Sequence, residues 1–320
     1  MTKPVKNVAA SLRAKLLEHT RQTKQDFQFV LDRWVGERFL FRLGQSKRRE
    51  QFVLKGATLF LIWKGRLPRP TRDVDLLGYG SPQVEDVVAL MKEICLLEVN
   101  DGIIFQSNEI KGEPIREDAE YHGVRAWVPA SLDGARSKLQ IDIGFGDVVN
   151  PEAEERVLPT ILELEPPRLK AYPPEVAIAE KLQAMVYLGM ANSRMKDFFD
   201  IWVLCQEQTF QMSRLRTAIA STFKRRQTPL PVEPPTALAA TFLKDKGKND
   251  QWNAFLTRIA WSGDKGDLKE VGEVISEFLL PIIEQARTDS QEEWVWAPGG
   301  PWTPGRSLSG LMALTNLPLV

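Results

Sequence analysis

The spacing of apolar and polar side chains predicts two kinds of structure in the first half of the chain. Residues 8–44 repeat apolar positions at helical intervals and predict two amphipathic helices. From about residue 52 the pattern changes to short apolar runs bounded by glycine and proline, which is typical of strands. The expected strands lie at 52–54, 73–77, 102–106, 124–128 and 139–143, with helices at 58–63 and 84–97. This mixture indicates an α+β or α/β domain over roughly residues 50–150.

The segments around this domain differ from it in composition. Residues 1–50 are expected to form basic helices that pack on a core at 51–150. Six prolines within residues 151–174 predict a connector. Residues 175–287 return to helical spacing and predict a helical domain. Residues 288–320 are rich in tryptophan, proline and glycine and predict an irregular tail.

The composition excludes several classes of protein. The 320 residues include two cysteines and two histidines, too few for a disulfide framework or a histidine-rich zinc site. No apolar run approaches the ~20 residues that a membrane helix needs. The first residues lack the apolar stretch of a secretory signal. We therefore expect a protein of the reducing cytoplasm that does not enter a membrane.

The charges balance over the whole chain but not along it. There are 42 basic and 42 acidic residues, yet residues 1–50 hold twelve Lys and Arg against five Asp and Glu, a net charge of +7. A second basic cluster lies at 224–226. Basic surfaces attract phosphate backbones by counterion release, whereas solvated helix faces are the simpler explanation. The candidate RNA contacts are Arg48, Arg49, Lys224, Arg225 and Arg226.

Carboxylates are the first candidate for chemistry. In a strand over 73–77 the side-chain period of two places Asp73 and Asp75 on one face. At ~4 Å and an effective dielectric near 20 their repulsion costs about 4 kcal/mol. Arg69 and Arg72 could offset this repulsion, but Mg²⁺ or Mn²⁺ would do so better, because hard cations favour carboxylate oxygens. If the strand around 139–143 is its neighbour, Asp142 adds a third carboxylate, as in two-metal phosphoryl or nucleotidyl transfer. Singly, such acids are often only solvated strand residues.

A glycine turn joins the expected strand at 52–54 to the following helix. Backbone N–H groups at a helix start bind anions, and Gly56 permits close approach of a triphosphate. The sequence there is neither a P-loop nor a G-x-G-x-x-G fingerprint. The alternative is a tight turn that Thr58 helps to cap.

A lysine and two acids lie in the helical region. On one unbroken helix Lys181 and Asp197 would be ~24 Å apart. Gly189 with Asn192 and Ser193 instead predicts a stop and a new N-cap, which gives an antiparallel helical hairpin. The hairpin brings Lys181 toward Asp197 and toward Asp200, which is a neighbour of Asp197 on one helix face. These groups either serve a phosphate or form ordinary ion pairs.

Together, four stretches resemble the AbiEii/AbiGii-type toxin nucleotidyltransferases, which have a polymerase-β-like core. They are FVLKGATLF, RPTRDVDLL, QIDIGFGD, and AEKLQAM followed by NSRMKDFFDIWVL, in family order over about residues 35–205. The resemblance implies an α+β fold, with a mixed sheet and flanking helices, plus a C-terminal helical domain.

The resemblance also implies roles for individual residues. Thr71 belongs with the two aspartates in the S/T-x-D-x-D metal motif, and Asp142 looks like the third strand acid of the wider superfamily. Ala57 departs from the second glycine or serine of many relatives. The implied metal ligands are Asp73, Asp75 and Asp142. The implied catalytic residues are Asp73, Asp75, Lys181, Asp197 and Asp200, and those for the nucleotide are Gly56, Ala57, Thr58, Arg69, Thr71 and Lys181.

The function implied by the resemblance is metal-dependent nucleotidyl transfer. A magnesium-dependent enzyme would transfer NMP from an NTP to RNA, in particular the tRNA 3′ end, and release pyrophosphate. Such a protein would be the toxin of a toxin–antitoxin pair that blocks translation, with its antitoxin encoded nearby. Two alternatives stay open: a nucleotidyltransferase that modifies a protein or small molecule, and a non-catalytic module that binds nucleic acid or a partner.

Overall fold

The chain forms two compact units. The computed structural model describes residues 7–117, 121–261, 263, 266–288 and 291–305. Unit 1 comprises Met1–Asp147 and Glu152–Pro173, and unit 2 comprises Val148–Pro151 and Pro174–Val320.

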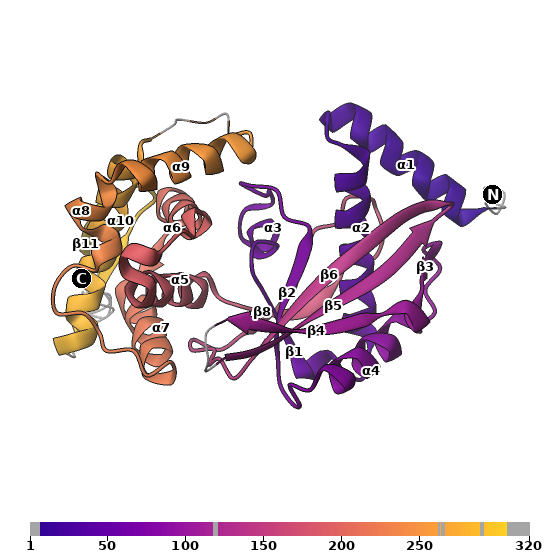
Figure 1. Ribbon diagram of the computed structural model, residues 1–320, viewed down its shortest axis with the longest axis horizontal. Coiled ribbons are helices and arrows are strands. Elements are labelled where there is room, and N and C mark those ends of the chain that lie inside the picture. The colour runs from indigo at the N-terminus through magenta and orange to yellow at the C-terminus, as the bar shows by residue number, and fades with distance from the viewer. Residues whose placement is uncertain (1–6, 118–120, 262, 264–265, 289–290, 306–320) are drawn as a thin grey trace, which may run out of the picture. The chain divides into compact units, whose positions relative to one another are not determined.

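A mixed sheet is the centre of unit 1 (Figure 1). Its strands are β1 Phe52–Lys55, β2 Asp73–Gly78, β3 Ile103–Phe105, β4 Lys111–Glu117, β5 Tyr121–Leu132, β6 Ala135–Phe145, β7 Glu154–Val157 and β8 Arg168–Ala171. They are ordered β3-β5-β6-β2-β1-β8-β7, with β4 paired to β5. The pairs β2–β6 and β1–β8 are parallel, and the other pairs are antiparallel. The predicted α+β fold is therefore confirmed.

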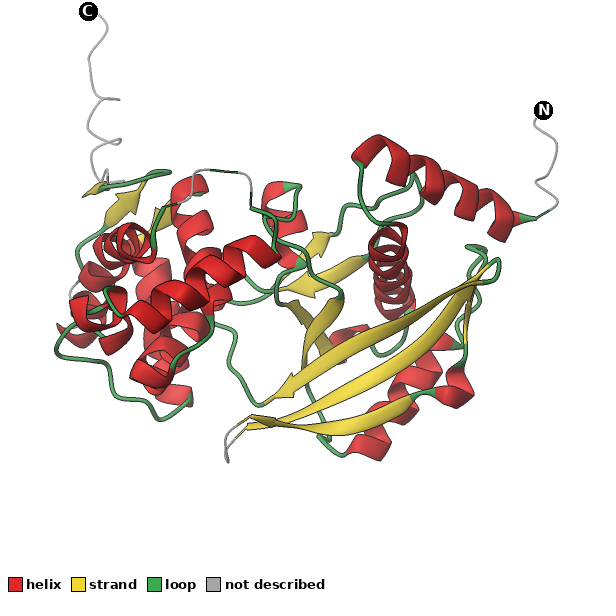
Figure 2. Cartoon of the chain, turned by 45° about the horizontal axis from the view of Figure 1, so that its top comes forward, coloured by secondary structure: helices red, strands yellow, loops and turns green. Residues whose placement is uncertain are grey.

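Two helices cover one face of this sheet, and Figure 2 shows both behind the long strands. They are α2 Phe27–Gln45 and α4 Val84–Cys95; the other helices of unit 1 are α1 Val8–Thr23, α3 Leu59–Lys64, and the short 3-10 helices η1 Arg49–Gln51 and η2 Ser107–Glu109. Gly36 of α2 lies against Val74 and Leu139, and Gly112 of β4 lies against Val84 of α4. Because successive side chains of a strand point to opposite faces of the sheet, the polar residues of β2, β5 and β6 lie on the face away from these helices.

The basic N-terminal segment places part of its charge inside unit 1. Arg38 and Arg42 of α2 are buried and pair with the buried Asp101 at 3.0 and 2.7 Å. Arg42 contacts both Asp101 oxygens, and Asp101 also accepts from the Ile103 backbone N–H. These arginines tie α2 to the segment before β3, and the surface of residues 1–50 is less basic than its sequence suggests.

This buried cluster gives a stability prediction. Asp101→Asn leaves two buried guanidinium groups against a neutral side chain and should lower the free energy of unfolding by about 3 kcal/mol. The matched control is Asp133→Asn, because Asp133 pairs with Arg13 at 3.5 Å where both side chains are a third or more exposed. The control should change stability by no more than about 0.5 kcal/mol. Urea unfolding of both variants measures the difference, and equal losses would contradict the prediction.

The segment predicted as a proline-rich connector contributes strands to unit 1. Within residues 151–174, β8 pairs with β1 and β7 pairs with β8. All four side chains of β7 are exposed, and its charged residues give no apolar alternation. The hydrophobic pattern therefore could not indicate this edge strand.

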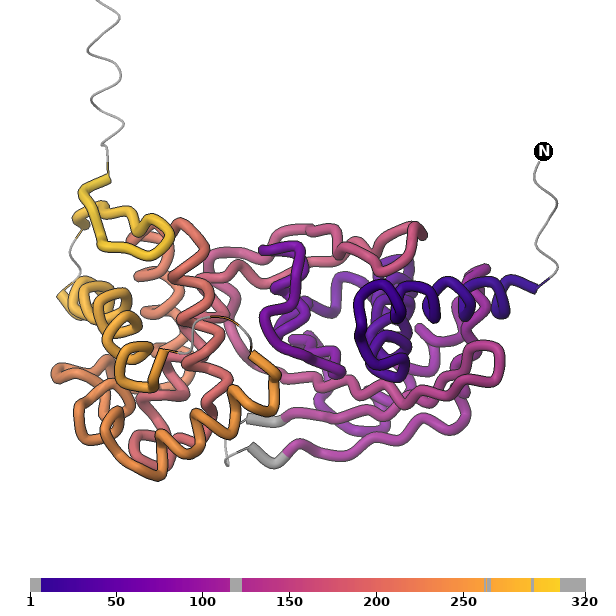
Figure 3. The backbone as a smooth tube through the Cα atoms, turned by 90° about the horizontal axis from the view of Figure 1, so that it is seen from above, coloured from indigo at the N-terminus to yellow at the C-terminus, as the bar shows by residue number. Residues whose placement is uncertain are grey.

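Unit 2 is a bundle of helices, as the helical period of residues 175–287 predicted. Its helices are α5 Pro174–Leu188, η3 Gly189–Ala191, α6 Met195–Glu207, α7 Met212–Arg225, η4 Thr236–Leu238, α8 Ala240–Leu243, α9 Lys246–Arg258 and α10 Leu268–Thr288. Figure 3 follows this unit from α5 to the end of its described chain. No helix in the described part of either unit has the length and apolar character that a membrane span requires.

The segment predicted as an irregular tail contains a small sheet. The strands β10 Trp294–Trp296 and β11 Trp302–Pro304 pair with each other, and β10 pairs with β9 Phe210–Gln211. The buried Trp296 donates to the Cys205 carbonyl at 2.7 Å, and Trp302 donates to the Phe278 carbonyl at 2.9 Å. The packing of these indoles therefore orders the segment into strands, although its glycine and proline content predicted an irregular structure. Residues 289–290 and 306–320 of that tail lie outside the described residues.

Candidate active site

The three strand carboxylates come together at the centre of the unit 1 sheet. In the parallel pairing of β2 with β6, Asp75 lies opposite Asp142 and Asp73 lies opposite Gln140. One carboxylate oxygen from each of the three aspartates lies within 4.8 Å of the others. All three side chains are half-buried. The structure thus has the convergence that strand alternation predicted.

Gly56 leaves room for one of these carboxylates. It follows β1 with φ +77, a conformation that side chains with a Cβ rarely adopt. A Cβ on Gly56 would also overlap the Asp75 carboxylate. The glycine is therefore needed for two local reasons, its backbone angle and its closeness to Asp75.

The rest of the glycine turn differs from one expectation. Helix α3 begins at Leu59, and Thr58 makes no side-chain cap hydrogen bond, so Thr58 does not cap as the simpler explanation supposed. Its backbone is already helical at this position (φ −58, ψ −26), whereas a capping side chain needs extended backbone. Ala57 is buried, and Arg69 is half-exposed.

The third carboxylate is already paired with a cation. Arg125 of β5 donates to both Asp142 oxygens at 2.8 Å, and Gln140 donates to them at 3.1 and 3.0 Å. The hydrogen bonds to Asp142 raise the pKa of Arg125 above its ordinary value. Asp142 therefore brings a charge that the chain itself neutralises.

The donor set of β2 fits a hard divalent cation. Asp73 accepts a short hydrogen bond from the Thr71 hydroxyl, which orients its carboxylate. Asp73 and Asp75 offer oxygens of the kind that Mg²⁺ and Mn²⁺ prefer. Asp142 can become a third ligand only if one of its oxygens contacts both the metal and Arg125, or if its hydrogen bond to Arg125 breaks.

Sequence reasoning missed Arg125 and Lys55 as neighbours of the carboxylates. Lys55 is in register with Asp75 across the β1–β2 pair, and its ammonium lies 3.3 Å from Asp147. For Arg125 the signal was present, because Val124, Ala126 and Val128 alternate inward and leave Arg125 on the polar face. Which strand β5 joins cannot be read from that alternation.

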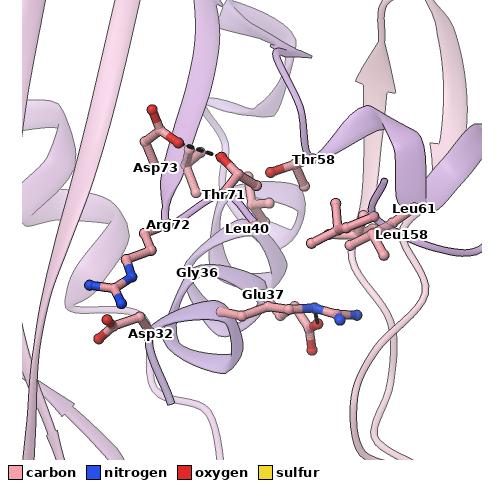
Figure 4. A pocket seen from close by; sticks show the side chains of 13 residues that line it. Asp32, Gly36, Glu37, Leu40, Thr58, Leu61, Thr71, Arg72, Asp73 and Leu158 are labelled. Atoms are coloured by element: carbon pink, nitrogen blue, oxygen red, sulfur yellow. Dashed lines mark hydrogen bonds and ion pairs between the residues drawn. The ribbon is translucent and has the colours of Figure 1, made fainter. Parts of the chain in front are cut away.

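A small pocket lies beside Asp73, between α2, α3 and β2 (Figure 4). Thr71 and Asp73 line it together with Arg72, Asp32 and Glu37 of α2. Glu37 is buried, lies 3.2 Å from the Arg33 guanidinium and accepts from the Ile161 backbone N–H at 3.0 Å. Burial raises the pKa of Glu37 to about 7 in spite of these partners.

The raised pKa of Glu37 gives a pH prediction. Between about pH 5 and 8 the folded protein binds more protons at Glu37 than the unfolded chain does. The contribution of Glu37 to the free energy of unfolding is therefore present at pH 5 and is lost as the pH rises through about 7. A shift from 4.5 to about 7 corresponds to about 3 kcal/mol. The stability of wild type relative to Glu37→Gln should fall by that amount from pH 5 to 8. Parallel urea-unfolding profiles for the two proteins would contradict this.

The helical hairpin of unit 2 brings the lysine and both acids together. The Lys181 ammonium lies 2.7 Å from Asp197 and 2.9 Å from Asp200. The acids are 5% and 1% exposed, whereas the Lys181 side chain is 19% exposed. The acids therefore lie beneath the ammonium and hold it, and the lysine is the member of the trio that solvent reaches.

The bend of this hairpin is built differently from the sequence prediction. Gly189 has φ +47 and follows the end of α5. Asn192 does not cap α6; its side chain accepts from the Arg194 N–H, and α6 begins at Met195 without a side-chain cap. The buried Lys248 donates to the Asn192 carbonyl at 2.9 Å. A local Asx turn and a contact from α9 thus replace the expected cap.

The predicted RNA contacts have acidic neighbours. Arg48 pairs with Glu93 at 2.9 Å, and Arg49 pairs with Glu50 at 3.0 Å. Arg226 donates to Gln183 at 2.8 Å and lies 3.6 Å from Glu180. Lys224 and Arg225 are exposed.

Carboxylates grouped on neighbouring strands beside a glycine turn form an arrangement for metal-assisted nucleotidyl transfer. The model of the family "Nucleotidyl transferase AbiEii toxin, Type IV TA system" matches residues 38–271. The chain therefore belongs to the AbiEii family and is a nucleotidyltransferase of the toxin–antitoxin type.

Two solved structures are also similar to this chain. A crystal structure of a proposed nucleotidyltransferase from H. pylori is similar at a TM-score of 0.46 and 17% identity, over 79% of this chain and 94% of that chain. The crystal structure of JHP933 from Helicobacter pylori is similar at a TM-score of 0.45 and 16% identity, over 79% of this chain and 90% of that chain. No curated protein matches the sequence.

Proposed function

We propose that this nucleotidyltransferase uses Mg²⁺ or Mn²⁺ to transfer NMP from an NTP to the 3′ end of an RNA, with tRNA as the acceptor. The modification blocks translation in the cytoplasm until a cognate antitoxin, encoded nearby, counteracts it. The observation that carries the proposal is the cluster of Asp73, Asp75 and Asp142, whose oxygens approach within 4.8 Å. Like charges held this close serve a bound cation better than they serve the fold.

In this proposal the residues of unit 1 hold the metal and the phosphates. Asp73 and Asp75 would be the ligands of the metal. Asp142 would join them once Arg125 gives up its hydrogen bond to one of the Asp142 oxygens. A metal held there would neutralise charge on the α-phosphate and so favour attack by a ribose hydroxyl with release of pyrophosphate. Gly56, Ala57 and Thr58 supply the turn for the triphosphate, while Arg69 and Thr71 support the phosphates and Asp73.

The hairpin of unit 2 supplies the ammonium in the same proposal. Lys181 neutralises phosphate charge, and Asp197 and Asp200 are positioning residues that fix its amine. The geometry favours this role, because Lys181 is the more exposed member of the trio. Lys224 and Arg225 attract the RNA backbone, and Arg48, Arg49 and Arg226 contribute when they exchange their acidic partners for phosphate.

The two alternative functions make different demands on the site. A protein or small-molecule acceptor would keep the same carboxylates and lysine but would not need a basic surface. A non-catalytic binding module would need neither the adjacent carboxylates nor the room that Gly56 leaves for Asp75. The close packing at Gly56 thus favours catalysis.

The direct test is label transfer by the full chain, with purified protein, each labelled NTP, Mg²⁺ and total RNA. Wild type should label RNA, and Asp73→Asn should reduce the rate roughly a thousandfold, because a ligand carboxylate carries several kcal/mol of charge stabilisation. Since the substitution also relieves repulsion, it should not lower the free energy of unfolding. A variant that loses stability together with activity would point to a structural role.

Two comparisons separate the possible acceptors and the role of Lys181. Label on protein or a small molecule instead of RNA would contradict RNA as the acceptor, but it would still support metal-dependent nucleotidyl transfer. Lys181→Ala would remove the cation that both buried acids contact, so Lys181→Arg, which keeps the charge, is the informative variant. It should stay folded and transfer more slowly, and EDTA should abolish transfer by every active variant.

The toxin role predicts growth arrest in cells. Induced expression of wild type should stop growth and reduce incorporation of labelled amino acids, and Asp73→Ala should abolish both effects at equal protein level. Arrest that persists with Asp73→Ala would favour the non-catalytic alternative.

A further inference from the structure

The open face of the unit 1 sheet carries an aromatic side chain that the transfer chemistry does not use. Trp127 of β5 is paired in register with Gln140 of β6, and Gln140 is in turn paired with Asp73 of β2. The indole is half-exposed, whereas its neighbours along the strand, Ala126 and Val128, are buried. It therefore lies on the carboxylate face, two strands from Asp73.

Cationic side chains surround this indole. The Lys138 ammonium lies 4.3 Å from the ring centroid, and the Arg125 guanidinium lies 6.0 Å from it. Lys111 of β4 is in register with Trp127, and Lys138 and Lys111 are both exposed. Across the indole Glu113 accepts from its N–H at 3.4 Å. A π-face beside exposed cations is the arrangement by which proteins bind single-stranded nucleic acid.

We infer that this face binds the single-stranded 3′ end of the RNA acceptor, with the terminal base stacked on Trp127 and its phosphate on Lys138. The inference rests on the proposed function. Lys138 is exposed, and its contact with the ring is weaker than base stacking, so an incoming base can displace it. The contact is sequence-tolerant, because every base has a π-face.

Strand order assigns this face to the acceptor and not to the incoming NTP. The order is β5-β6-β2-β1, so the turn at Gly56 follows the strand on one side of β2, while Trp127 lies on the other side. Attacking and leaving oxygens lie roughly in line in phosphoryl transfer. If the turn takes the triphosphate, the attacking hydroxyl comes from the β6 and β5 side.

The distance from the indole to the carboxylates suits one nucleotide. Neighbouring strands are ~4.8 Å apart, so Trp127 and Asp73 are separated by ~10 Å at the backbone. A nucleotide whose base lies on the indole can extend its ribose hydroxyl over that distance. Arg125 is held by both oxygens of Asp142, and its guanidinium lies 6.0 Å from the indole, so it can contact the last phosphate or ribose.

The test is binding of a fluorescent single-stranded oligoadenylate to the full chain, without NTP or metal, followed by anisotropy. Trp127→Ala should weaken binding roughly 5- to 150-fold, the loss expected for one base on one aromatic ring. Trp127→Phe should restore most of the affinity. Trp294→Ala, which removes another half-exposed indole, is the matched control and should bind as wild type does. The slope of log K against log salt is negative, and Lys138→Gln should reduce its magnitude by about 0.7, the value of one phosphate contact on a single strand.

Steady-state kinetics of the same variants complete the test. Trp127→Ala should raise KM for the RNA and leave KM for the NTP unchanged. A rise in KM for the NTP with unchanged oligoadenylate binding would assign the indole to the NTP base and overturn the inference. Equal binding by Trp127→Ala and wild type would overturn it as well, even where wild type labels RNA. Wild type that binds oligoadenylate through Trp127 but labels no RNA would instead contradict the proposed function.

Discussion

The site depends on keeping three carboxylates within 4.8 Å of one another against their mutual repulsion. Strand pairing makes this possible, because the register of β2 with β6 sets Asp75 opposite Asp142, and their Cα atoms cannot move apart without breaking the ladder. Packing behind the sheet holds β2 and β6 from the other face, where Val74 and Leu139 lie against Gly36 of α2. Within the chain, Arg125 pairs with both oxygens of Asp142 and so offsets one of the three charges.

In unit 2, buried carboxylates are held next to a cation of the chain itself. There two buried acids, Asp197 and Asp200, both contact the Lys181 ammonium, at 2.7 and 2.9 Å. Buried carboxylates cost free energy unless they are paired, so Lys181 stabilises the fold, and the two contacts fix its amine where the side chain is still 19% exposed. A structural ion pair and a phosphate-binding lysine are therefore not exclusive, since the acids that stabilise the fold also position the amine.

Local periodicity predicted the parts of the site that depend on one strand or one bend. The shared face of Asp73 and Asp75 follows from a period of two, and the meeting of Lys181 with Asp197 follows from a break near Gly189. Arg125 was missed because its partner is set by the register of β5 with β6, a long-range feature. Strand β7 was missed because its exposed charged residues show no alternation, and β10 because tertiary packing of Trp296 decides its structure. How Asn192 forms the bend depends on Lys248, 56 residues away, which no local pattern contains.

Strand order also limits how substrates reach the carboxylates. Because β2 lies between β1 and β6, the two sides of the site differ in chemistry: a glycine turn with backbone N–H groups on one side, and an indole with exposed cations on the other. A turn suits a compact polyanion, which needs many donors close together. A flat aromatic ring suits a base, and separate lysines suit the wider spacing of phosphates along a strand. The asymmetry around β2 thus favours transfer between two different nucleotides over a reaction in which one small molecule occupies both sides.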